Sequence, residues 1–150
     1  MTPDRFIAKW RDQARTERSA SQEHFLDLCE LLEVPKPADV DPKGKTFTFE
    51  KTTGRLGKDS KGFVDVWKKD CFIWEYKGDR KSLKEAHAQA KLATAELGNP
   101  PLLIVSDMKV IQVHTNFTGR VTETKHFELV DLNGPEARRK LKLAFTDPQH

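Results

Sequence analysis

Two neighbouring stretches occupy the middle of the chain, Gly62-Phe63-Val64-Asp65-Val66-Trp67-Lys68 and Cys71-Phe72-Ile73-Trp74-Glu75-Tyr76-Lys77. Both are rich in β-branched and aromatic residues and have the length of a strand. The polar residues Lys69 and Asp70 separate them and indicate a turn. The sequence therefore predicts a β-hairpin with one acidic residue in each strand, Asp65 and Glu75.

The segments on either side of this hairpin predict a sheet with helices on both faces. Residues 46–51 have strand character, and Ser82-Leu83-Lys84-Glu85 matches a capping box that begins a helix through Leu97, which Gly98 would end. The continuous apolar run at 102–105 indicates a strand buried on both faces. Further helices are expected at 4–14, from Ser19 to the prolines at 35 and 37, and at 136–145, and further strands at 109–116 and 125–130. This order predicts an α/β fold with a central mixed β-sheet flanked by helices.

Composition narrows the class of protein. The chain has 150 residues, a net charge of +3 and 33% charged residues, yet its nine phenylalanines and three tryptophans are enough for one folded core. No apolar run approaches the ~20 residues of a membrane span, and the first residues lack the apolar stretch of a signal peptide. Cys29 and Cys71 form no disulfide framework. We therefore expect a cytoplasmic protein and exclude the secreted, membrane and zinc-ribbon classes.

The hairpin also holds a pattern that suits metal-dependent chemistry. Asp65 is followed by Glu75 and then by Lys77, an acid, a second acid and a lysine two residues later. Hydrolysis of a phosphodiester by a divalent metal uses carboxylates as ligands for Mg²⁺. A lysine on the same face can orient water or neutralise developing negative charge. The acid-x-Lys pattern alone is weak, because the chain contains six examples, which begin at Asp41, Asp59, Glu75, Asp79, Asp107 and Glu123. Only Glu75 ends an apolar strand paired with a second acid.

The length of the turn decides whether the two acids meet. With a two-residue turn, Asp65 would lie opposite Trp74 rather than Glu75. An odd number of connecting residues, or a bulge near 68–71, would bring Asp65, Glu75 and Lys77 to one face. The other face would then carry an apolar layer of Val64, Val66, Phe72, Trp74 and Tyr76.

These segments resemble those of a known family. The hairpin, together with Gln89 in the next helix, is similar to the PD-(D/E)xK nuclease superfamily. More narrowly, the chain resembles the N-terminal endonuclease domain of MmeI-type restriction-modification proteins. The resemblance covers most of residues 5–132, and besides the hairpin it includes Ser21-Gln22-Glu23, Phe49-Glu50-Lys51 and the stretch at 100–107. Val64 stands where the superfamily's nominal proline would precede the first acid, and Ala93 stands where an aromatic residue often follows the helix glutamine.

The resemblance implies roles for individual residues. Asp65 and Glu75 would hold Mg²⁺ with help from the main-chain carbonyl of Tyr76, and Lys77 would assist the attacking water. Gln89 would support the site from the edge of its helix. Outer positions around the metal would fall to Glu50 and to Gln22 or Glu23.

The resemblance also implies a division of the chain and a set of partners. Residues 1–18 would be an N-terminal helical arm, 19–132 the nuclease core and 133–150 a basic helix that starts a connector. The substrate would be double-stranded DNA. An adenine methyltransferase that uses S-adenosylmethionine, and a target-recognition domain, would lie outside this chain, which is then an excised domain or a natural fragment of a larger protein. The basic clusters near both ends and in the middle would contact phosphates without reading sequence.

Two other interpretations remain open. In the first, the same fold is a non-catalytic DNA or protein interaction domain, and Lys77 pairs with Asp65 or Glu75 as a structural ion pair. In the second, the chain is a stand-alone nuclease of the repair or Holliday-junction type, which predicts a stable dimer. The scattered histidines, His24, His87, His114, His126 and His150, lack the spacing of metal ligands.

Overall fold

A computed structural model describes residues 1–13, 17–53, 62–77 and 82–149. Its centre is a six-stranded sheet in which the strands lie in the order of the sequence. The strands are β1 (Phe47–Thr53), β2 (Gly62–Lys68), β3 (Phe72–Tyr76), β4 (Leu102–Ser106), β5 (Val110–Thr115) and β6 (Thr124–Glu128). Neighbouring strands run antiparallel except β3 and β4, which are parallel. The predicted α/β class with a mixed sheet is confirmed.

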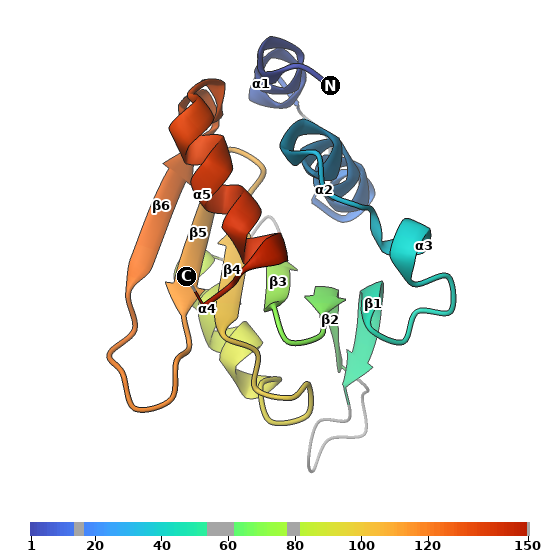
Figure 1. The fold of residues 1–150 in the computed structure, drawn as a ribbon, viewed down its shortest axis with the longest axis vertical. Coiled ribbons are helices and arrows are strands. Elements are labelled where there is room, and N and C mark those ends of the chain that lie inside the picture. Colours follow the sequence, from blue (N-terminus) through green and yellow to red (C-terminus); the bar gives the residue numbers. More distant parts are fainter. Residues whose placement is uncertain (14–16, 54–61, 78–81, 150) are drawn as a thin grey trace.

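The helices cover both faces of this sheet (Figure 1). They are α1 (Pro3–Arg11), α2 (Glu17–Leu32), α3 (Pro37–Val40), α4 (Leu83–Leu92) and α5 (Pro135–Thr146), with a short 3₁₀ helix η1 (Leu129–Asn133) before α5. Helix α4 is the crossover between the parallel strands β3 and β4. It lies on the face opposite to α5, α1 and α2. None of the helices in the described part of the chain is long and apolar enough to cross a membrane.

The two faces of the sheet are packed differently. On the face of α1, α2 and α5, aromatic rings meet edge to face, with Phe25 5.1 Å from Trp74 and Phe72 5.2 Å from Phe145 between centroids. On the face of α4, the core is smaller and includes Ala90 and Ala93 of the helix region, which let the helix approach the sheet closely. The larger, aromatic core therefore lies on the face of the sheet that α1 and α2 cover.

Several predicted element boundaries shift. Helix α4 begins as predicted, because the Ser82 hydroxyl accepts a hydrogen bond from the Glu85 N–H at 3.2 Å, but it ends at Leu92 rather than at residue 97. Beyond it the chain turns, and the Ala93 N–H bonds the Ala90 carbonyl three residues back. Helix α2 begins at Glu17, two residues before the expected capping box, and α3 and η1 form where no helix was predicted.

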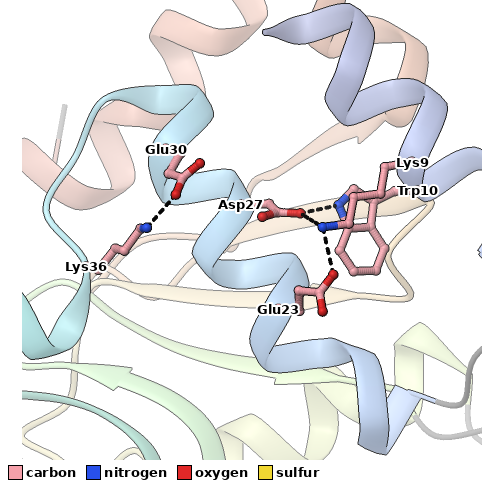
Figure 2. A network of polar contacts seen from close by, with 6 residues as sticks. All are labelled: Lys9, Trp10, Glu23, Asp27, Glu30 and Lys36. Atoms are coloured by element: carbon pink, nitrogen blue, oxygen red, sulfur yellow. Dashed lines mark hydrogen bonds and ion pairs between the residues drawn. The ribbon is translucent and has the colours of Figure 1, made fainter. Parts of the chain in front are cut away.

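Helix α1 is part of the main core rather than separated from it. The Thr2 side chain caps it by accepting from the Arg5 N–H at 3.3 Å. Phe6 and Trp10 are fully buried. The indole N–H of Trp10 donates to Asp27 of α2 at 3.1 Å, and the Lys9 ammonium lies 2.7 Å from the same carboxylate (Figure 2). Burial and charged hydrogen bonds together dock α1 on α2.

Candidate functional site

The two strands that carry the acids are joined by three residues. Lys68 pairs with Phe72 and Val66 with Trp74, so the connection is 69–71. Asp70 has a φ of +63°, and the Cys71 N–H bonds the Lys68 carbonyl at 3.1 Å, which closes the turn. One step beyond Val66 and Trp74, this register puts Asp65 opposite Glu75. The predicted odd-numbered connection is confirmed.

At the acid pair, side chains bond the main chain of the opposite strand. The Asp65 N–H donates to Oε1 of Glu75 at 2.8 Å, and the Tyr76 N–H donates to Oδ2 of Asp65 at 2.7 Å. Glu75 is only 5% exposed, and Asp65 is half-buried. Charged acceptors make strong hydrogen bonds, which offset part of the cost of burying the carboxylates. The reciprocal bonds fix each acid against the other strand.

The pairing of β1 with β2 is interrupted at the same level. Phe49 pairs with Val66 and Lys51 with Val64, but Glu50 between them has a φ of +50°. A left-handed backbone at a residue other than glycine is strained, and such strain collects at functional sites. Glu50 lies across from Asp65 in this register, so the irregular backbone and the first acid coincide.

Both strands change faces at this interruption. Val66 belongs to the aromatic core, whereas Val64 belongs to the α4 core. On β1, Phe49 packs against the aromatic core, whereas the Lys51 ammonium lies 4.8 Å from the centroid of Trp67 in the α4 core. The expectation that Val64 shares a layer with Val66, Phe72, Trp74 and Tyr76 is therefore wrong for Val64 and confirmed for the other four. Val64 and Val66 are two residues apart on β2 and yet pack in different cores, so the two-residue alternation from which that layer was predicted does not hold through Asp65.

A cavity of about 430 Å³ opens beside Asp65. It lies between α2, β1, β2 and the end of β3, and its walls combine carboxylates, an amide, a hydroxyl and aromatic rings. Its lining residues are Ser21, Gln22, Phe49, Glu50, Phe63, Asp65, Val66 and Tyr76. Of the predicted residues, the cavity thus brings together Asp65, Glu50, Gln22 and Tyr76.

The remaining predicted residues lie toward α4 or on the outside of α2. By the two-residue period, Glu75 and Lys77 follow Ile73, which packs in the α4 core. Lys77 directly follows β3 and is half-buried, and its N–H donates to the Ser106 carbonyl at 2.9 Å. Gln89, also half-buried, precedes the fully buried Ala90 on α4.

Glu23 takes part in the network that docks α1. Its carboxylate lies 2.7 Å from the Lys9 ammonium, which also meets Asp27 (Figure 2). The hydrogen bonds that the Lys9 ammonium donates, first to Asp27 and then to Glu23, raise the pKa of Lys9. Of the two alternatives predicted on α2, Gln22 lines the cavity and Glu23 pairs with α1.

Sequence reasoning missed the part played by His24. Its Nδ1 lies 2.8 Å from the hydroxyl of Tyr76, inside the aromatic core. Burial lowers the pKa of His24 to about 3. The available signal was its place beside the apolar stripe of α2, next to Phe25. The bond ties α2 to Tyr76, the residue whose N–H holds Asp65.

One comparison with known proteins identifies the chain. The family described as "MmeI, N-terminal domain" matches residues 1–149. The chain belongs to this family. The MmeI N-terminal domain associates it with restriction-modification enzymes, which act on DNA. The six-stranded mixed sheet with flanking helices is consistent with the restriction-endonuclease-like α/β fold expected of such a domain. Searches of curated proteins and of solved structures found no match.

Proposed function

We infer that this chain is the DNA-cleavage module of a restriction-modification enzyme and hydrolyses phosphodiester bonds with a divalent metal. One observation carries the proposal: the three-residue turn brings Asp65, which lines the cavity, opposite Glu75 on the neighbouring strand. Membership of the MmeI N-terminal domain family supports the same substrate, DNA.

The donor chemistry of the acid pair suits a hard cation. Asp65 and Glu75 would hold Mg²⁺ together with the Tyr76 main-chain carbonyl, because Mg²⁺ prefers carboxylate and carbonyl oxygens. When bound, such an ion supplies a more acidic water and stabilises negative charge on phosphate. The hydrogen bonds donated by the Asp65 N–H to Glu75 and by the Tyr76 N–H to Asp65 would keep both carboxylates oriented before an ion arrives.

Other residues would act around this pair. Lys77 is the first residue after β3 and lies two residues after Glu75. It would orient the attacking water or neutralise charge on the phosphate. Gln89 would support the site from α4. Glu50 lines the cavity beside Asp65 and would hold outer water molecules, whereas Glu23, bound to Lys9, would contribute only indirectly.

The rest of the proposal concerns what lies outside the chain. Double-stranded DNA would be positioned by an adenine methyltransferase, which uses S-adenosylmethionine, and by a target-recognition domain. Membership of the MmeI N-terminal domain family supports a place in a restriction-modification protein that acts on DNA. A cytoplasmic location fits the two free cysteines, Cys29 and Cys71.

Metal binding tests the proposal without requiring the isolated domain to cut DNA. We would titrate Mn²⁺ and Mg²⁺ into the wild type, Asp65→Asn and Asp70→Asn, and follow heat by calorimetry. Asp70 is exposed on the turn of the same hairpin, so Asp70→Asn removes the same charge away from the site. We expect Asp65→Asn to lose at least about tenfold in affinity and Asp70→Asn to bind like the wild type.

A second candidate function is a non-catalytic domain with a nuclease-like fold. Two observations favour it: Glu75 is nearly buried, and both acids already accept main-chain hydrogen bonds. Within the described residues, no group of three or more acids, histidines or cysteines is arranged to hold a metal. If the wild type takes up no divalent ion even with DNA present, this structural interpretation replaces the nuclease.

A further inference from the structure

Phe63 is exposed at the rim of the cavity. It lies on β2 two residues before Asp65 and leaves 52% of its surface in contact with solvent. The structure describes all nine phenylalanines, and the other eight are buried or half-buried. Phe63 is thus the one phenylalanine whose ring is turned mainly to water, and it lies next to the first acid of the candidate site.

The lining of this cavity suits an uncharged group. Two carboxylates, Glu50 and Asp65, line it, and no lysine or arginine does so in the described part of the chain. An unscreened phosphate would be repelled there, whereas a neutral aromatic group would not. The volume of about 430 Å³ equals that of roughly 14 water molecules at about 30 Å³ each, more than one nucleobase of roughly ten non-hydrogen atoms requires.

The walls offer both stacking faces and hydrogen-bonding groups. Phe49 and Tyr76 contribute aromatic surface beside Phe63. Gln22 is exposed on the α2 side and carries amide donors and an acceptor, and Ser21 adds a hydroxyl. Nucleobases stack on aromatic side chains and use such groups on their edges.

We propose that Phe63 is the stacking platform for one unpaired nucleobase of the DNA strand held at Asp65 and Glu75. The inference rests on the proposed function, since it deepens the substrate class of that site: a strand locally opened beside the cleavage point. Gln22 and Ser21 contact the edge of the base, and Phe63 covers its face. The domain therefore binds frayed, bulged or single-stranded DNA more tightly than an uninterrupted duplex.

Oligonucleotide binding tests this subsite. Fluorescence anisotropy of labelled DNA with one bulged base, and of the matching perfect duplex, is measured at one low salt concentration in Ca²⁺, which fills carboxylate sites without supporting cleavage. The proteins are the wild type, Phe63→Ala, Phe63→Trp and Leu92→Ala. Leu92 is 75% exposed on α4, on the opposite face of the sheet, so Leu92→Ala removes exposed apolar surface away from the cavity.

We expect the wild type and Leu92→Ala to bind bulged DNA about tenfold more tightly than duplex. Phe63→Ala loses this preference, and Phe63→Trp, which retains an aromatic face, keeps it. Equal binding of both DNAs by the wild type, no binding of bulged DNA, or an unchanged preference in Phe63→Ala would each overturn the inference.

Calorimetry of Phe63→Ala separates this result from the nuclease proposal. If Phe63→Ala still binds divalent ions and also keeps the preference for bulged DNA, only the proposed base subsite is wrong. If Asp65→Asn binds divalent ions as the wild type does, the nuclease proposal itself is wrong.

Discussion

The β2–β3 hairpin has two halves built by different forces. In the closed half, residues 66–68 and 72–74 form a regular ladder, and their side chains enter the two cores. In the open half, residues 63–65 and 75–77, the carboxylates of Asp65 and Glu75 bond the main chain across the gap. Val64 and Tyr76 of this half still pack in the cores, but Phe63, Asp65 and one side of Tyr76 line a cavity. Over a few residues, the hairpin changes from a scaffold into a surface that can receive a ligand.

This difference shows where stability and function separate. Burial of apolar side chains determines the structure of the closed half. Substitutions there cost stability, because the aromatic rings fill the core edge to face. The open half holds charged groups that apolar packing would not select, together with a left-handed residue at Glu50. Substitutions in one half, compared with matched variants elsewhere in the chain, test this difference.

The largest expected effect compares two phenylalanines of the same hairpin. Phe72 is fully buried in the closed half, and its ring lies 5.2 Å from Phe145 and 5.6 Å from Trp74 between centroids. Phe72→Ala should lower the free energy of unfolding by about 3–5 kcal/mol, since it leaves a cavity in the core. Phe63→Ala in the open half should cost less than about 1 kcal/mol. Urea unfolding at neutral pH measures both.

Phe72→Leu is the variant to use if Phe72→Ala does not fold, because it keeps more of the buried volume and should lose less stability. Equal losses for Phe63→Ala and Phe72→Ala would contradict the contrast. They would mean that the Phe63 ring packs in solution as firmly as a core residue.

A smaller effect concerns the bond that ties the open half to α2. His24 bonds the Tyr76 hydroxyl in the core, while the Tyr76 N–H holds Asp65 in the open half. The rings of Phe6 and Trp10 lie 5.4 and 4.9 Å from the imidazole between centroids. Burial lowers the pKa of His24 from 6.5 to about 3, so the unfolded chain takes up a proton at a pH where the folded chain does not. Stability should therefore fall as the pH drops below about 6.5 and continue to fall toward pH 3.

From these values the loss attributable to His24 between pH 7 and pH 5 is about 2 kcal/mol. His24→Gln retains a hydrogen-bonding side chain but cannot titrate, so it should lack this part of the slope. Chemical unfolding of the wild type and of His24→Gln at both pH values gives the difference directly. The remaining slope should include His114, whose pKa burial lowers to about 4. Identical slopes in the two proteins would show that His24 is hydrated in solution.

Much of the closed half could be predicted from sequence, and the reason is periodicity. The aromatic and β-branched run at 72–76, and outside the hairpin the Ser82 cap and the apolar run at 102–105, are local signals, and each forms the element it predicts. The sequence also predicted that an odd number of residues in the turn would place Asp65 opposite Glu75, as the structure has it. The open half was harder to predict. No glycine marks the left-handed residue at position 50, and nothing in the sequence signals that Val64 and Val66 pack in different cores. The His24–Tyr76 bond joins residues 52 positions apart, and no local pattern signals it.

The smallest effect examines the strained residue itself. Glu50 and Glu33 have similar left-handed backbones, with φ of +50° and +56°. Glu33 follows the last residue of α2, and the Val34 N–H bonds the Cys29 carbonyl at 3.0 Å, a common helix ending in which glycine is preferred. Replacing either glutamate by glycine removes the steric cost of this backbone, and each variant should gain up to about 1 kcal/mol in urea unfolding. Glu50→Gly should in addition change divalent-ion binding beside Asp65, whereas Glu33→Gly should leave it unchanged. The opposite result would be a loss of stability in Glu50→Gly beside a gain in Glu33→Gly. It would mean that contacts of the Glu50 side chain in the cavity outweigh the backbone strain. The open half would then be held together more tightly than its interrupted ladder suggests.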